Sequence, residues 1–183
     1  MADNNENPAS PEASSGKKKK KKKTAFDYAR AFFIKIGVTA AVIAALLIWV
    51  AGVYVCHDNS SYPMIKDGDL CITYKLGSLE QGDAVAYKYG DKIRFGRVIA
   101  AGGDEVGIFN DYITVNGSGV FEDVIYPTTP EGSKITYPYK VPENCVFILN
   151  DHRTDISDSR TAGGISEDDI KGKIVFVMRR RGI

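Results

Sequence analysis

The sequence has little cysteine and little histidine, with three Cys and two His in 183 residues. The cysteines, Cys56, Cys71 and Cys145, are odd in number and far apart, which excludes a disulfide framework. The chain also lacks a CxxC pair and a histidine cluster, so we expect no metal and no cofactor. Cys71 and Cys145 lie in apolar runs and are predicted to be small buried side chains. A disulfide between these two is the alternative.

The presumed folded part of the chain has no excess of basic residues. Residues 57–183 carry 15 Lys and Arg against 19 Asp and Glu, a net charge of −4, whereas the whole chain is at +1. The positive charge is concentrated in residues 17–23, an unbroken run of seven lysines. A nucleic-acid-binding protein normally carries its basic patch on the folded domain, so we expect no nucleic-acid partner.

The first residues of the chain lack the side chains that build a core. Residues 1–16 contain no aromatic residue and are predicted to be disordered. The lysines of residues 17–23 stand before a hydrophobic run, where basic residues stay on the cytoplasmic side. Residues 1–23 are therefore predicted to be a cytoplasmic tail. A solvated linker and a nuclear-localisation or nucleic-acid role are the alternatives.

One long apolar run is present. Residues 36–56 contain no charged residue, and 21 residues at about 1.5 Å each reach roughly 31 Å, the thickness of a hydrocarbon core. We predict a single membrane-spanning helix here, extended inward so that the anchor comprises residues 24–56. A cleaved signal sequence is the weaker alternative, because the run is long for one. Residues 57–183 are then extracytoplasmic and the chain is a single-pass cell-membrane protein.

The remaining residues show alternating apolar runs separated by turn residues and no internal repeat. This pattern predicts short strands and no convincing helix. We therefore expect a mainly β domain, an antiparallel barrel or two-sheet structure, after the one N-terminal membrane helix. The expected strands are residues 70–75, 84–89, 92–101, 108–117, a run after Val124, 145–150 and 173–180.

Paired serines lie next to a proline where the chain would leave the membrane, in residues 59–70, NSSYPMIKDGDL. Three further blocks follow in order: GDAVAY, GRVIAAGGDEV and NDHRTDISDSRTAGGISEDDIKGK. Together these blocks resemble bacterial type I signal peptidases, membrane-anchored serine proteases that remove signal peptides from exported proteins. The resemblance covers residues 36–178 and implies the signal-peptidase fold for the β domain.

The resemblance assigns the nucleophile to Ser60, which with Ser61 and Pro63 matches the family pattern of serine, methionine, any residue, proline. It also matches Gly68 and Asp69 to the turn after the nucleophile, and residues 97–99, Gly103 and Asp104 to the central block. The last block matches at Asp151, Arg153, Asp158, Ser159, Arg160 and Gly163, and the resemblance implies that these late residues mostly brace the floor of the active site through turns and salt bridges.

Three positions depart from the family pattern. A serine needs a base, and the family's buried lysine falls on Gly96. The serine that orients this lysine falls on Ile156, with Ser157 one place late. Asp58 falls on the oxyanion site, where a donor normally contributes about 3 kcal/mol and a carboxylate would oppose the developing charge.

Other residues could replace the base. Lys92 lies on the same strand face as Gly96 but about 13 Å along the strand, at roughly 3.3 Å per residue. His152 lies in the last block and is a conceivable base for Ser60. If Ser61 were the nucleophile instead of Ser60, it would still need a base.

Two function classes therefore stay open, with signal peptides or pilin precursors and the lipid membrane as partners. One is an active signal peptidase that uses Ser60 with an unconventional base. The other is a pseudoenzyme that keeps the fold and binds exported precursors in protein secretion or pilus assembly. Signal-peptidase-like proteins of Gram-positive pilus clusters have such a replaced catalytic dyad.

Overall fold

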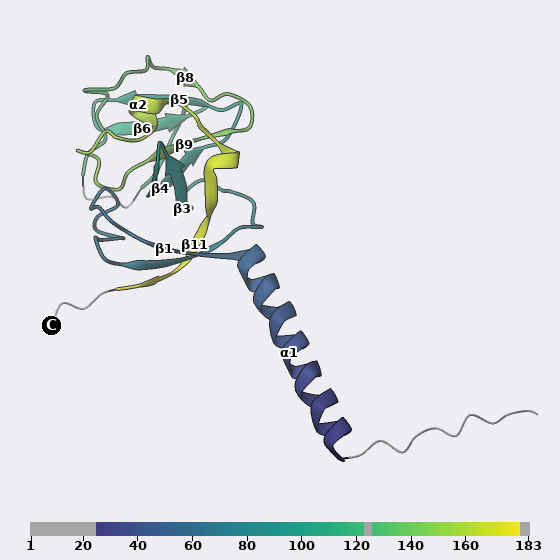
Figure 1. The fold of residues 1–183 in the computed structure, drawn as a ribbon. Helices are drawn as coiled ribbons and strands as arrows, with labels where there is room; N and C mark the ends of the chain where they lie inside the picture. Colours follow the sequence, from purple (N-terminus) through teal and green to yellow (C-terminus); the bar gives the residue numbers. More distant parts are fainter. Residues whose placement is uncertain (1–24, 123–125, 180–183) are drawn as a thin grey trace, which may run out of the picture. The chain divides into compact units, whose positions relative to one another are not determined.

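The computed structural model describes residues 25–122 and 126–179 (Figure 1). The predicted tail of residues 1–23 lies outside this range. The chain divides into two compact units at Val42, within the N-terminal helix. This helix, α1, spans Ala25–Val50, and its residues Tyr28–Val50 are long and apolar enough to cross a membrane. At about 1.5 Å per residue these 23 residues measure roughly 35 Å.

The sequence predicted that the apolar run stays helical to Cys56, but the helix ends earlier. Helix α1 ends at Val50, and β1, Ala51–Val55, pairs antiparallel with β2, Leu70–Tyr74. Valine and tyrosine favour an extended strand once a partner strand is available. Gly52 permits a close approach of β1 to its partner residue Thr73 on β2, because a Cβ at position 52 would lie 2.7 Å from Thr73 Oγ1.

Lys75 ties the end of α1 to the end of β2. Its amide donates to Val50 O at 2.9 Å, and its Nζ donates to Ile48 O at 3.0 Å. These bonds satisfy carbonyl groups that have no partner within the last turn of a helix. The transition from helix to strand is thereby fixed at Val50.

Seven strands form the large sheet, in which every neighbouring pair is antiparallel. Their order is β1-β2-β11-β3-β4-β9-β10. The strands not yet given are β3, Ala84–Tyr89, β4, Lys92–Ala100, β9, Cys145–Leu149, β10, Ile165–Ser166, and β11, Ile170–Met178.

The small sheet has the order β7-β6-β5-β8. Its strands are β5, Glu105–Phe109, β6, Tyr112–Val115, β7, Ser118–Gly119, and β8, Tyr139–Lys140. The sequence predicted one strand over residues 108–117, but these residues form parts of two strands. Phe109 pairs with Tyr112 across a two-residue loop, and Asn110 in that loop has φ 51°, a conformation that asparagine tolerates.

The strand predicted after Val124 begins among residues that the structure does not describe, and the described residues 126–138 form no strand. Two short helical segments were not predicted: α2, Ser159–Ala162, and the 3₁₀ turn η1, Glu167–Asp169. Both are too short to produce a helical period in the sequence. The prediction of a mainly β, two-sheet antiparallel domain after one apolar helix is confirmed.

The core of the β domain consists of three apolar clusters. One lies between β9 and the small sheet and includes Phe147 and Leu149. A second includes Tyr87 and Ile148, and a third includes Phe95 with Cys56 and Cys71. All three cysteines are free thiols, and Cys145 packs against the first cluster, so the structure contains no bridge from Cys71 to Cys145.

The cysteine environments predict different reactivities. Burial raises the pKa of both Cys56 and Cys71, the latter to about 12, so neither thiol forms the reactive thiolate near neutral pH. Both side chains are also fully buried, whereas Cys145 is half-buried. We expect a maleimide to label Cys145 of the folded protein first, as measured by peptide mass spectrometry. Denatured protein, the control, should label at all three; equal rates for Cys71 and Cys145 in the folded protein would contradict the prediction.

Candidate functional site

The turn between β1 and β2 carries Ser60 and Ser61 and holds both in the interior. The two serines are 2% and 0% exposed. Ile65 N–H donates to Ser61 O at 2.9 Å, and Gly68 N–H donates to Cys56 O at 2.9 Å. Gly68 has φ 84°, a backbone conformation that glycine adopts without steric cost, so the turn requires glycine at this position.

The hydroxyl of Ser60 donates to a carboxylate. Ser60 Oγ lies 2.6 Å from Asp58 Oδ1, and the Ser60 amide donates to the same oxygen at 3.0 Å. The carbonyl oxygen of Ser60 accepts from the His152 amide at 2.9 Å. Ser61 Oγ donates to Phe95 O at 2.7 Å, so the second serine is bound to the backbone of β4.

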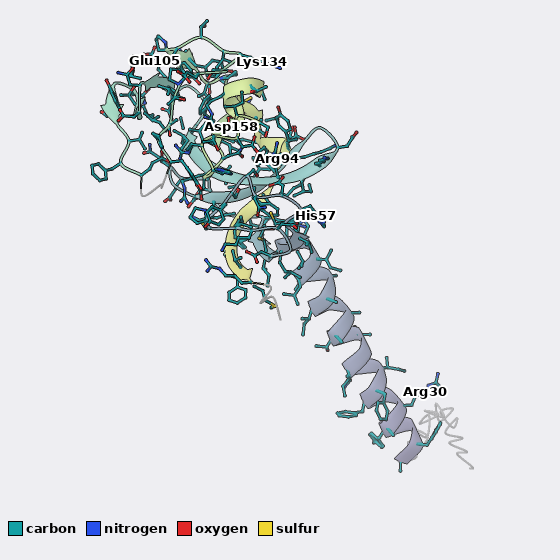
Figure 2. The ribbon with its side chains drawn as sticks, turned by 90° about the vertical axis from the view of Figure 1, so that its left-hand side faces the viewer. Arg30, His57, Arg94, Glu105, Lys134 and Asp158 are labelled. Carbon is teal, nitrogen blue, oxygen red and sulfur yellow. The ribbon has the colours of Figure 1, made fainter. Side chains whose placement is uncertain are left out.

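Arg94 supplies the positive charge beside this pair. Its Nη2 lies 3.5 Å from Asp58 Oδ2 and 3.2 Å from Asp155 Oδ2, and its Nη1 donates to Ser157 O at 3.1 Å. The side chain is 13% exposed and lies within the β domain (Figure 2). A guanidinium keeps its proton under all ordinary conditions, so Arg94 cannot be a general base.

Asp155 completes this charged group. Burial alone would raise its pKa, but hydrogen bonds from the Ser157 hydroxyl and amide and the charge of Arg94 lower the pKa below its usual range. Asp58 and Asp155 therefore flank one guanidinium, and the hydroxyl of Ser60 is joined to this group through Asp58.

The position that the resemblance assigns to the base has neither an amine nor space for one. A Cβ on Gly96 would lie 2.6 Å from Ile148 Cγ2, 3.0 Å from Leu149 O and 3.4 Å from Tyr87 Cε1. Burial also raises the pKa of Tyr87, so its phenol is neutral and is not a base either.

The Ile156 side chain lies against Gly132, since its Cδ1 is 2.8 Å from the point where a Cβ on Gly132 would be. The side chains nearest to a Cβ on Gly96 are those of Ile148 and Tyr87, and no motif in the sequence pointed to either.

The two alternative bases make other contacts. The ring of His152 packs against Tyr126, with centroids 4.6 Å apart, and against Tyr62, at 6.5 Å. Among the described residues, the contact of His152 with Ser60 is through its backbone amide. Lys92 begins β4 and is exposed.

A fully buried ion pair lies in the last motif block. Asp158 caps α2 and pairs with Arg160 at 2.8 Å, both side chains fully buried, while Asn150 N–H donates to Asp158 Oδ2 at 3.0 Å. Ser159 Oγ accepts from Ile148 N–H at 2.9 Å. These contacts join α2 to β9 and the residue after it.

Two further arginines, Arg97 and Arg153, each form a bidentate ion pair with a carboxylate. Arg97 donates to both carboxylate oxygens of Asp151 at 2.9 Å, and this hydrogen bonding raises the pKa of Arg97. Arg153 donates to both oxygens of Glu122, at 2.8 and 2.6 Å, and to Asn150 O at 2.7 Å. Bidentate pairs of this kind fix geometry as well as charge.

The remaining motif glycines and aspartates lie in turns. Gly103 and Gly163 have φ 87° and 76°. Asp69 accepts from the Lys66 amide at 3.0 Å, and Asp104 accepts from the Ala101 amide at 2.9 Å. Pro63 lies half-buried within the Ser60 turn.

Comparisons with known proteins identify the family of the chain. Residues 27–179 match the family model described as signal peptidase, peptidase S26. The chain is 30% identical to signal peptidase I of Bacillus caldolyticus, over 76% of this chain and 85% of that protein. It is likewise 30% identical to signal peptidase IB of Staphylococcus aureus, over 79% and 86% respectively. A solved signal peptidase I from Enterococcus faecalis V583 has 23% identity and a TM-score of 0.46, covering 53% of this chain and 97% of that chain. The chain belongs to the signal peptidase family.

The packing around Gly96 generates a prediction. Gly96→Ala should lower the free energy of unfolding by about 1–3 kcal/mol, because the added methyl overlaps Ile148 and a backbone oxygen. The matched control is Gly119→Ala, where an added Cβ meets nothing within 4 Å. Urea unfolding of the full chain in detergent measures both.

A double substitution sharpens this test. Gly96→Ala with Ile148→Ala should lose less stability than the sum of the two single changes, because the second change removes the nearest clashing methyl. Wild-type stability of Gly96→Ala would show that the space over Gly96 is open.

Proposed function

We propose that this signal peptidase family member binds exported precursor polypeptides at the outer face of the membrane and performs little or no proteolysis. The observation that carries the proposal is the hydrogen bond from Ser60 Oγ to Oδ1 of Asp58, which also faces Arg94, together with the glycine at position 96, which offers no base. A serine attacks a carbonyl group only when a neighbouring base takes its proton.

The site opposes acyl transfer at two steps. The Asp58 carboxylate that accepts the hydrogen bond from Ser60 also faces Arg94 at 3.5 Å, so its negative charge is engaged by a cation at the step where a base would draw the proton from the serine. The same carboxylate would repel the oxyanion that forms during attack, where a donor would stabilise it by about 3 kcal/mol.

The second candidate is an active peptidase with Asp58 as an unconventional base. The 2.6 Å contact from Ser60 Oγ to Asp58 Oδ1 favours it, because this is the distance that proton transfer requires. The two candidates differ in what Asp58→Asn does. If Asp58 is the base, the cleavage rate should fall about 100-fold or more in this variant. If the protein only binds its client, the cleavage rate is already at background and should not change.

Cleavage of a preprotein with a small-residue site tests the proposal. We expect wild-type protein, Ser60→Ala and Asp58→Asn to give the same background rate by gel assay, with signal peptidase IB of Staphylococcus aureus as the positive control. Gly96→Lys should not restore cleavage, because its stem would overlap Ile148. Adding Asp58→Ser, Ile156→Ser and Ile148→Ala to Gly96→Lys should raise the cleavage rate above that of Gly96→Lys alone. Robust wild-type cleavage that is lost in Ser60→Ala would overturn the proposal.

A groove beside Asp58 supports the binding role. This β1 groove, lined by residues 53–55, His57, Asp58 and residues 91–93, has a volume of about 540 Å³. Strand β1 is at the edge of the large sheet, and the side chain of Val53 is 62% exposed. An extended client can add to such an edge through backbone hydrogen bonds, with its side chains against the apolar wall.

A charge in the groove should weaken this binding. We expect Val53→Asp to lower affinity for a synthetic signal peptide about tenfold or more, because the carboxylate would be desolvated by the bound chain. Val175→Asp is the matched control, since Val175 is 59% exposed on β11 and does not line the groove. Fluorescence anisotropy in detergent gives both affinities. Equal losses in the two variants would rule out the β1 groove as the binding site.

The clients that we propose are signal peptides of secreted proteins and pilin precursors. The family relation supports precursors that carry signal peptides. Pilin precursors are included because the vacated base position is like that of the signal-peptidase-like proteins of pilus clusters.

The proposed location is the cell membrane, with residues 1–23 cytoplasmic and residues 57–183 outside. The lysine run before α1 supports this orientation. The β domain also exposes apolar side chains on β1, β2 and β11, including Val53, Tyr74 and Phe176, as a domain beside a lipid surface would. Protease added to intact spheroplasts should digest the β domain and spare the tail. Protection of the β domain would contradict this orientation.

A further inference from the structure

A second cleft lies at the other end of β4. This cleft, called here the Arg97 cleft, is lined by residues 97–99 of β4, by residues 120–122 and by Gln81 and Gly82, and its volume is about 410 Å³. Arg97 is its cationic wall and Phe121 its aromatic wall. Arg97 belongs to the central motif block, whereas Phe121 lies outside all four blocks.

Strand β4 connects the two clefts. The β1 groove touches the beginning of β4, at Lys92 and Ile93, and the Arg97 cleft touches residues 97–99. Phe95 lies between them on the strand, and its carbonyl oxygen accepts the hydrogen bond from Ser61 Oγ. Ser60 is therefore held beside the middle of β4. At about 3.3 Å per residue, a chain that leaves the groove and passes Ser60 reaches the Arg97 cleft after roughly four residues.

The walls of the Arg97 cleft are held in place. The Arg97 guanidinium is fixed by Asp151 and by a hydrogen bond to Gly82 O at 2.8 Å. On the other wall, Val120 N–H donates to Ile113 O at 2.9 Å, and the Glu122 carboxylate is bound by Arg153.

Phe121 is unusual within this rigid frame, because its side chain is fully exposed between two anchored neighbours. An aromatic side chain has only two side-chain torsions to fix on binding and offers a large apolar surface. Together with a fixed guanidinium it suits a peptide that presents an apolar side chain to the ring and backbone carbonyl groups to the cation.

We propose that the Arg97 cleft binds the segment of an extended client polypeptide that lies beyond Ser60, with an apolar client side chain against Phe121. The inference rests on the proposed function, since the same client occupies the β1 groove. The client then crosses Ser60 in an extended form and is held on both sides of it.

Site-specific photo-crosslinking of the full chain in lipid nanodiscs tests this. The probe is a synthetic peptide that contains a signal peptide and the first ten residues after its small-residue site. p-Benzoylphenylalanine replaces Val53, Phe121 or, as the control, Phe109. Phe109 is 45% exposed on β5 and lines neither cleft.

We expect crosslinks from positions 53 and 121 to client residues at least about four positions apart, and none from position 109. Crosslinks from position 53 without any from position 121 would overturn this inference and leave the proposed function standing. Crosslinks from neither position would overturn both. Crosslinks from position 121 to a second copy of the chain, or to the residues reached from position 53, would also overturn the inference.

Affinity gives a second, independent measurement. Phe121→Ala should weaken binding of the full peptide about fivefold, the usual effect of losing an aromatic anchor, and leave unchanged the binding of a peptide truncated at its small-residue site. Phe109→Ala is the control. Equal affinity of wild-type protein and Phe121→Ala for the full peptide would contradict the assignment.

Discussion

The carboxylate of Asp58 joins the Ser60 turn to the charged groups of the site, because it accepts a hydrogen bond from the hydroxyl of Ser60 and also faces Arg94. In the proposed function this arrangement differs from that of a serine peptidase, in which a neutral base faces the serine and donors face the oxyanion. The same arrangement stabilises the resting fold, since Arg94 links the Ser60 turn to Asp155 and Ser157 of the last motif block.

The supporting contacts do not depend on catalysis. Arg160 pairs with Asp158, Arg97 with Asp151 and Arg153 with Glu122. Removing one partner of a buried pair leaves an uncompensated charge and typically costs about 3–5 kcal/mol, so selection for folding alone would keep these residues. The family signature in the last block is therefore evidence for the fold, while the residues around Gly96 and Asp58 bear on the chemistry.

Much of the fold could be predicted because it depends on local patterns. Alternation and turn residues located β2, β3, β4, β9 and most of β11, and the uncharged run located α1. The end of α1 could not be predicted, because β1 exists only through its pairing with β2. The hairpin at Asn110 was missed because two short strands with a polar loop resemble one alternating run.

The motif blocks predict Ser60 as the nucleophile and Gly96 as the position of the missing lysine, and both assignments stay predictions. The contacts around them could not be predicted, because they depend on packing: Ile156 lies against Gly132, and Ile148 and Tyr87 are the side chains nearest to a Cβ on Gly96. Arg94 lies two residues before Gly96 on β4, so strand alternation could have placed its side chain on the same face. Its contact with Asp58 depends on the long-range approach of the Ser60 turn to β4.

The surroundings of the Ser60 hydroxyl decide between a binding protein and a peptidase, and a crystal structure of the full chain with a bound client peptide measures them most directly. We predict an intact peptide, with Ser60 Oγ within hydrogen-bond distance, about 2.6–3.2 Å, of Asp58 Oδ1 and with Arg94 between Asp58 and Asp155. A lysine or histidine nitrogen at that distance from Ser60 Oγ, or a covalent bond between Oγ and the client's carbonyl carbon, would contradict the absence of a working base.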